Sequence, residues 1–234
     1  MVQVTNEVER GSWLLERLHG LTSVGSVAGQ GAEAYVRLLH PLWRDAPHDW
    51  SKQRWTDVAA AQGRVMHPLV QWGRLHDVHD PYAPGSSIGW LDPVVLAALV
   101  PLLGAATTTP DDLVAGFWEG GSGQRLVSQE RLQVPGRACV LATTSIDELS
   151  DPDWGFSMRL GWLPYSRHNS LQLLWPEDHA WVLASEIDWD STIIAGSRAL
   201  VDSILGDDRF ETFEVGPDDD LSWDGDVVNG PEAR

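Results

Sequence analysis

The order of the expected strands and helices constrains the fold of this chain more than any other feature. Apolar runs indicate strands at residues 34–39, 113–119, 137–143 and 180–187. Apolar spacing and capping residues indicate helices at residues 12–18, 51–62, 94–103 and 197–205. Because strands and helices do not alternate regularly, an α+β fold is favoured over a doubly wound parallel sheet. We expect a mixed or antiparallel sheet with a few packed helices and long loops.

Length and composition indicate one main domain. The 234 residues, 43% of them hydrophobic, can bury a core of normal size. We expect a single α+β domain over residues 1–215, with a small N-terminal subdomain over residues 1–90 as an alternative division. Residues 216–234 are rich in aspartate and poor in apolar side chains, which predicts a flexible acidic tail.

Several classes of protein are disfavoured by the composition. The longest apolar run, 94–106, is interrupted by Pro101 and Gly104 and is too short to cross a bilayer. The first ten residues lack the basic and apolar regions of a secretory signal. The single cysteine, Cys139, allows neither an internal disulfide nor a multi-cysteine zinc site. The only lysine, Lys52, does not lie in a nucleotide-binding P-loop. These features predict a soluble, cytoplasmic protein without a membrane partner.

Acidic residues outnumber basic residues by 34 to 16, which gives a net charge of −18. The excess is uneven, because residues 186–234 contain 14 acidic and 3 basic side chains. A field of this sign repels a phosphate backbone, so we expect no nucleic-acid partner. It would favour a basic protein partner, or it would simply keep the protein in solution.

The stretch from Trp175 to Leu205 holds the strongest candidate for a catalytic or metal site. The expected strand over residues 180–187 leads into Glu186, Asp188 and Asp190, which alternate with apolar residues. Residues two apart on a strand face the same side, so these carboxylates could converge on one divalent cation. The simpler interpretation is that the acids end a strand and begin the next turn or helix.

The pattern Asp188-x-Asp190-x-Thr192, followed by two isoleucines, resembles the first motif of the haloacid dehalogenase-like phosphotransferases. The resemblance implies that Asp188 is a nucleophile and Asp190 a general acid/base, both beside magnesium. It covers this motif alone, and it departs from the family because the motif lies late in the chain and no lysine follows it. The pattern keeps a metal-dependent, phosphatase-like hydrolase among the candidate functions.

Histidines supply a second candidate metal site. His76 and His79 are each followed by an aspartate, and His67 lies nearby. Imidazole and carboxylate together suit first-row divalent metals, although the prolines that follow also fit a metal-free surface turn. Gly85–Gly89 matches the pattern G-x-S-x-G, but the strand that a nucleophile elbow requires does not precede it. Cys139 lies in an apolar strand and is expected to be a small buried hydrophobe.

Tryptophan is unusually abundant, with thirteen residues. Some of these rings belong in the core, where each buries a large area and its N–H group needs a partner. Others could line a ligand groove or anchor a partner. The candidates for a ligand-binding groove are Trp118, Trp162, Trp175 and Trp181.

Several blocks of the sequence resemble a widespread family of uncharacterised actinobacterial proteins. The blocks run over residues 35–41, 54–59, 63–68, 107–120 and 175–197. The likeness extends from about Tyr35 to the C-terminal tail. It implies one co-folding unit of cytoplasmic origin, and it carries no activity to transfer.

Three functions remain open at this point. The favoured one is a non-enzymatic binding or interaction protein whose acidic face meets a basic partner. The second is a metal-dependent hydrolase that uses Glu186, Asp188 and Asp190. The third is a small-ligand binder with a tryptophan-lined pocket. Neither the ligand, the partner nor the oligomeric state follows from the sequence.

Overall fold

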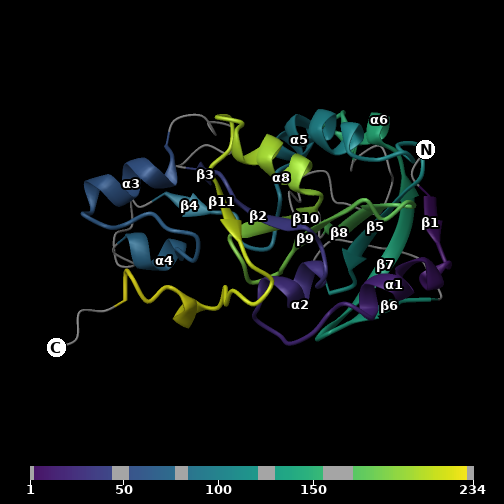
Figure 1. The fold of residues 1–234 in the computed structure, drawn as a ribbon, viewed down its shortest axis with the longest axis horizontal. Helices are drawn as coiled ribbons and strands as arrows, with labels where there is room; N and C mark the ends of the chain where they lie inside the picture. Colours follow the sequence, from purple (N-terminus) through teal and green to yellow (C-terminus); the bar gives the residue numbers. More distant parts are fainter. Residues whose placement is uncertain (1–2, 44–52, 77–83, 121–129, 155–170, 231–234) are drawn as a thin grey trace.

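The computed structural model describes residues 3–43, 53–76, 84–120, 130–154 and 171–230. Its centre is an antiparallel sheet in the order β1-β7-β5-β8-β9-β10-β2-β11, with β6 paired to β7 (Figure 1). The expected α+β class with an antiparallel sheet is therefore confirmed. The strands of this sheet are β1 (Gln3–Thr5), β2 (Ala34–Leu39), β5 (Leu113–Trp118), β6 (Leu132–Val134), β7 (Arg137–Thr144), β8 (Leu171–Pro176), β9 (Trp181–Ser185), β10 (Ser191–Gly196) and β11 (Thr212–Val215).

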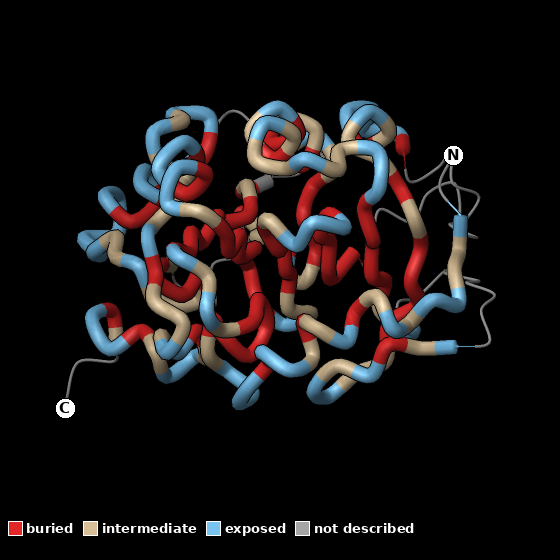
Figure 2. The backbone as a smooth tube through the Cα atoms, turned by 45° about the vertical axis from the view of Figure 1, so that its right-hand side comes forward, coloured by how far each residue is buried: buried red, intermediate tan, exposed pale blue. Residues whose placement is uncertain are grey.

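Helices cover both faces of the sheet. In Figure 1, α5 (Pro93–Ala105), α6 (Ile146–Leu149) and α8 (Arg198–Leu205) lie along its upper side. On the opposite side lie η1 (Val8–Gly11), α1 (Ser12–Leu15), α2 (Val24–Ala28) and the C-terminal segment with η2 (Trp223–Gly225). Alternate residues of a strand face opposite sides, so both sides of the central strands must be apolar. Figure 2 accordingly shows the central strands buried along their length.

Strand β9 shows how the sheet divides the core into two layers. Trp181 and Leu183 pack on the side of α5 and α8, whereas Val182 and Ala184 pack on the side of α1 and α2. The same alternation continues in β10. A run that reads as uniformly apolar in the sequence therefore serves two separate clusters.

A third apolar cluster lies beyond the end of β2. It contains α3 (Trp55–Ala61), α4 (Trp72–Leu75) and the small sheet of β3 (Leu42–Trp43) with β4 (Gly85–Ser86). The residues before it contribute to the main sheet, because β1 pairs with β7 and β2 pairs with β10. The alternative division at residue 90 stays a prediction.

Two expected helix starts are confirmed at the atomic level. The Asp92 carboxylate accepts a hydrogen bond from the Val94 backbone N–H at 2.6 Å, with Pro93 in the first turn of α5. The Ser197 hydroxyl accepts one from the Leu200 N–H at the start of α8. In the part of the chain that the structure describes, no helix combines the length and apolar character needed to span a bilayer.

The C-terminal segment lies against the body as far as residue 230, contrary to the flexible tail expected from its composition. Leu221 is 1% exposed and belongs to the cluster beside α2. Its backbone N–H donates to Thr22, and the Val24 N–H donates to Asp219. Asp226 and Asn229 are buried as well. The prediction overlooked that a few apolar and hydrogen-bonding side chains suffice when a preformed surface receives them.

The register across β9, β10 and β2 places two features at opposite ends of the same strands. At one end, Gly196 lies opposite both Trp181 and Ala34. At the other end, Thr192 lies opposite both Ser185 and Leu38. The first end borders a cleft, and the second end holds a buried polar network.

Candidate functional site

The acidic run 186–190 is a hairpin connection and not a strand. β9 ends at Ser185, a turn follows, and β10 begins at Ser191. Glu186 forms an ion pair with Arg137, Asp188 is exposed, and Asp190 is buried. Among the described residues, no group of three or more His, Cys, Asp or Glu side chains could hold a metal ion. Glu186, Asp188 and Asp190 do not share one face here as expected, because a turn does not keep the two-residue periodicity of a strand.

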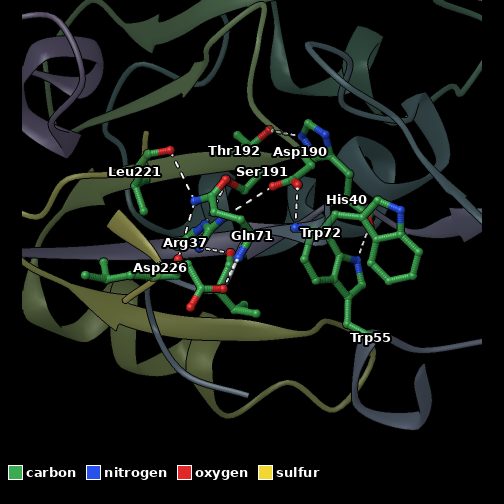
Figure 3. Close-up of polar contacts among 12 residues, drawn as sticks. Arg37, His40, Trp55, Gln71, Trp72, Asp190, Ser191, Thr192, Leu221 and Asp226 are labelled. Carbon is green, nitrogen blue, oxygen red and sulfur yellow. Dashed lines mark hydrogen bonds and ion pairs between the residues drawn. The ribbon is translucent and has the colours of Figure 1, made fainter. Parts of the chain in front are cut away.

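Asp190 instead forms a buried ion pair with Arg37 (Figure 3). One carboxylate oxygen accepts from the Arg37 guanidinium at 3.2 Å, and the other accepts from the Trp72 backbone N–H at 3.1 Å. Burial raises the pKa of Asp190, and the charge of Arg37 opposes that effect. The pair joins the sheet to the segment before α4, and both oxygens of Asp190 are already used. A nucleophilic or general-acid role has no geometric support here.

Arg37 satisfies its remaining donors within the protein. Its Nε donates to the Ser191 hydroxyl at 2.8 Å, and Nη1 donates to the carbonyls of Pro68 and Val70 at 2.9 and 2.7 Å. Figure 3 shows these groups around one guanidinium. A buried guanidinium is tolerated only when its donors are paired in this way.

His40 forms the second part of the network. Its Nδ1 lies 2.5 Å from the Ser87 carbonyl oxygen, so Nδ1 carries the proton and donates, and Nε2 accepts from the Thr192 hydroxyl at 2.8 Å. Thr192 and Ser185 share a further hydrogen bond of 2.7 Å. Burial lowers the pKa of His40 to about 4, so the ring is neutral at neutral pH. A hydroxyl on an oriented imidazole resembles an activated nucleophile, but Thr192 is 0% exposed and no substrate reaches it.

Asp226 connects the C-terminal segment to this region. It accepts hydrogen bonds from the Gln71 N–H at 3.0 Å, the Asn229 N–H at 2.9 Å and His67 Nε2 at 2.8 Å. Burial acts to raise the pKa of Asp226, but the hydrogen bonds from Asn229, Gln71 and His67 outweigh it and leave that pKa lowered. His67 therefore helps to hold the C-terminal segment against the residues that precede α4.

The second candidate metal site is only partly described. His76 stacks on Trp72 with ring centroids 4.5 Å apart, and its Nδ1 lies 2.9 Å from the Trp72 carbonyl oxygen. His79 lies outside the described residues. The G-x-S-x-G match at Gly85–Gly89 falls on β4 and the turn after it, with no helix directly following. Burial raises the pKa of Cys139 to about 12, which agrees with an inert buried thiol.

Of the four tryptophans proposed for a groove, three lie in the described residues, and of these Trp181 alone lines the cleft described below. Trp175 and Trp181 are fully buried, and the Trp181 indole N–H donates to the Leu103 carbonyl beneath α5. Trp118 is half-buried at the end of β5, and Trp162 lies outside the described residues. Their large rings fill the core of the sheet, as expected for part of the tryptophan complement.

A cleft of about 220 Å³ opens at the end of β9, β10 and β2, on the α1 side of the sheet. Val182 and Ala195 belong to its sheet side, and Trp13 and Arg17 belong to the α1 side. Small residues account for most of the remaining lining, which leaves the space open. They are Ala28, Gly29, Gly31, Ala32, Ala180 and Gly196.

Three residues of this cleft have left-handed backbone. Gly29 and Gly31 have φ values of 80° and 88°, which glycine adopts without strain. His179 has a φ of 56°, and it is the only non-glycine residue with positive φ in the described part of the chain. Its ring stacks on Trp13 with centroids 4.0 Å apart, and Trp13 packs edge-on against Trp175. A non-glycine residue held in this conformation is typical of a binding or catalytic site.

The charged side chains around the cleft differ in whether they have partners within the protein. Glu33 accepts from the Arg198 N–H at 3.0 Å, Glu177 pairs with Arg10 at 2.6 Å, and Asp178 accepts from Thr108. Arg17 is exposed with its guanidinium 5.2 Å from the Trp13 ring centroid, and it forms no ion pair with a described residue.

His179 itself is a neutral group at neutral pH. Desolvation, together with the cations of Arg17 and Arg10, lowers its pKa against the opposing effect of Glu177. Arg17 is therefore the cation of the cleft that remains available to a ligand.

Of the residues of this cleft, sequence reasoning singled out Trp181 as a ligand-binding candidate and did not bring the others together into a site. The glycines at 25–31 predict a loop, and the Trp175–Trp181 segment predicts a turn, which are both correct as local structure. Nothing in the sequence showed that this loop and this turn would meet beside α1. Comparison with protein-family models, curated proteins and solved structures finds no match to this chain.

Proposed function

We propose that this chain is a non-enzymatic binding protein that holds a small molecule in the cleft between α1, the 29–33 loop and the His179 turn. The observation that carries the proposal is His179, whose backbone is left-handed and whose ring forms part of the cleft wall. Strained backbone persists where the surrounding structure demands it, and binding sites are the usual place. At about 220 Å³ the cleft is smaller than the pockets of about 300 to 1,000 Å³ that hold drug-sized ligands, so its ligand would be a small one.

Two features support binding without catalysis. Of the described titratable groups that border the cleft, Glu33 accepts from the Arg198 N–H, Arg17 is unsuited to proton transfer, and the His179 ring is held by stacking on Trp13. Within the described residues, the hydroxyl–imidazole pair of Thr192 and His40 lies in the interior, at the other end of these strands. The proposal therefore assigns recognition to the cleft and a structural role to the buried network.

Ligand-observed NMR with a general fragment library tests the proposal. Ala32 lines the cleft and is only half-buried, so Ala32→Phe fills the space without entering the core. The matched control is Ala61→Phe, which adds the same ring to an exposed alanine at the end of α3. We expect fragments that bind the wild type and the control and are displaced in Ala32→Phe. Fragments that bind all three proteins equally, or no binding fragment at all, would contradict it.

A second candidate function is protein interaction through the acidic C-terminal third. Its support is the ratio of 14 acidic to 3 basic residues over 186–234, together with their exposure. The exposed carboxylates include Asp202, Asp208, Glu214, Asp218, Asp220 and Asp224. Such a surface favours a basic partner through long-range attraction. Of the remaining alternatives, a hydrolase at residues 186–190 has no support in this geometry.

A further inference from the structure

We propose that the cleft ligand is a small carboxylic acid with an apolar or aromatic body, and that Arg17 binds its carboxylate. The inference rests on the proposed binding function and specifies its ligand class. Two properties of the cleft lead to it, and they concern charge and shape separately.

The first property is the charge that the cleft leaves available. Each of the neighbouring carboxylates, Glu33, Glu177 and Asp178, already accepts hydrogen bonds from protein donors. Arg17 presents an exposed guanidinium at the mouth, oriented over the Trp13 ring. A guanidinium binds a carboxylate through two parallel hydrogen bonds, which gives both affinity and orientation. Arg17 is the one cation among the described lining residues and forms no ion pair with a described side chain, so a ligand carboxylate can bind to it.

The second property is the apolar sheet side below that charge. Val182, Ala195, Ala28 and Ala32 supply methyl groups, and the cleft holds about 220 Å³. Space of this size suits one ring or a short branched chain and is too small for a nucleotide. The stacked pair of Trp13 and His179 adds a rigid aromatic wall. An amphipathic monoanion meets both requirements together.

The net charge of the protein makes this inference sharply testable. At −18, the protein as a whole repels an anion, so a preference for a carboxylate must come from a local cation. Removing that cation leaves only the repulsive field. A variant without the Arg17 charge is therefore expected to favour the uncharged analogue of the same ligand.

The experiment compares three acids with their amides by NMR titration. The pairs are benzoate and benzamide, phenylacetate and phenylacetamide, and indole-3-acetate and indole-3-acetamide. For at least one pair we expect the wild type to bind the acid about tenfold more tightly than the amide. In Arg17→Gln that preference is lost or reversed while amide affinity changes less than twofold. Arg17→Lys keeps part of it, since an ammonium retains the charge without the bidentate geometry.

Two controls separate the possible failures. Arg64→Gln removes an exposed arginine that does not border the cleft, and it should leave every preference unchanged. Ala32→Phe should abolish binding of acid and amide alike. If both bind equally and both depend on Ala32, or if Arg17→Gln keeps the preference, the ligand class is wrong and the binding function stands. If no probe binds in an Ala32-dependent way, the binding function itself is contradicted.

Discussion

Buried polar residues decide how this molecule is held together at the residue scale. Arg37 is 1% exposed, yet each of its three guanidinium nitrogens has an acceptor, and these acceptors come from the turn before β10, from β10 itself and from the 68–70 segment. A buried ion pair adds little net stability, but loss of one partner leaves an uncompensated charge. The network therefore fixes the relative positions of segments that are far apart in sequence.

The neutral imidazole of His40 predicts a specific dependence of stability on pH. Its pKa is about 4 in the folded protein against 6.5 for an ordinary histidine, so the unfolded chain binds more protons between these values. The contribution of His40 to the free energy of unfolding should consequently be fully present above pH 6.5. It should decline by about 2 to 3 kcal/mol as the pH falls towards 4.

Urea unfolding between pH 7 and pH 4.5 measures that decline. In His40→Gln the decline should be smaller than in the wild type by that amount, because the titrating group is gone. His19→Gln, which removes an exposed histidine, should keep the wild-type profile. An unchanged slope in His40→Gln would show that His40 is not the group responsible.

Short segments gain their conformation from contacts at the element scale. The C-terminal segment has one short 3₁₀ turn, η2, and otherwise follows the surface offered by α2 and α4. Trp223 lies under the Arg74 guanidinium, 4.4 Å from ring centroid to carbon, and beside Gly73. A side chain at position 73 would collide with that indole. Local propensity plays little part in holding this segment.

Asp226 and Asp224 offer a matched pair of substitutions for testing how the C-terminal segment is held against the body. Asp226→Ala removes an acceptor that serves Gln71, Asn229 and His67, so buried donors lose their partner. We expect the free energy of unfolding to fall by about 2 to 3 kcal/mol. Asp224 is 94% exposed and makes only a 3.8 Å contact with Arg74, so Asp224→Ala should cost less than about 0.5 kcal/mol. Equal effects in chemical denaturation would argue against a structural role for the segment.

At the scale of the whole molecule, most of the net negative charge comes from one part of the chain. Residues 186–234 supply −11 of the net −18, given their 14 acidic and 3 basic side chains. Many of these acids remain exposed on α8, β11 and the C-terminal segment. A surface of this kind attracts cations at long range, and the attraction weakens as salt is added.

The second candidate function, binding of a basic partner by the acidic surface, predicts salt-dependent binding of a cationic probe such as octa-arginine. Neutralising Asp202, Asp208, Asp218 and Asp224 together should weaken that binding several-fold at low salt. Neutralising four exposed acids of the first 150 residues should weaken it less, although the change in net charge is the same. These controls are Glu9, Glu16, Asp111 and Asp147. Equal losses in the two variants, measured by calorimetry, would mean that only net charge matters.

Much of the fold follows from local signals. The bounds of β2 match the expected strand 34–39, and α5 begins at the predicted Asp92–Pro93 cap. β10 was missed, because Ser191–Gly196 lies between a hairpin and a helix and carries no polar alternation to mark it. Both of its faces are buried, so its sequence lacks the period of a half-exposed strand.

The candidate site was harder to predict than the fold. Trp13 and Arg17 lie more than 160 residues before His179, and they meet it only because α1 packs over the sheet end where the β8–β9 turn projects. The arrangement of the acids at 186–190 was mispredicted for a related reason. Their period of two suggests a shared face, whereas arginines from β2 and β7 and a turn draw them apart.

By itself, the sequence determined the class of the fold, the positions of four strands and four helices, two helix caps and the uneven charge. These depend on interactions within about ten residues, which local patterns record. Only the tertiary structure decided which polar groups are buried together, that the C-terminal segment folds back, and where a cleft stays open. Those outcomes depend on contacts between distant segments, whose burial and hydrogen bonding exist only once the sheet has formed.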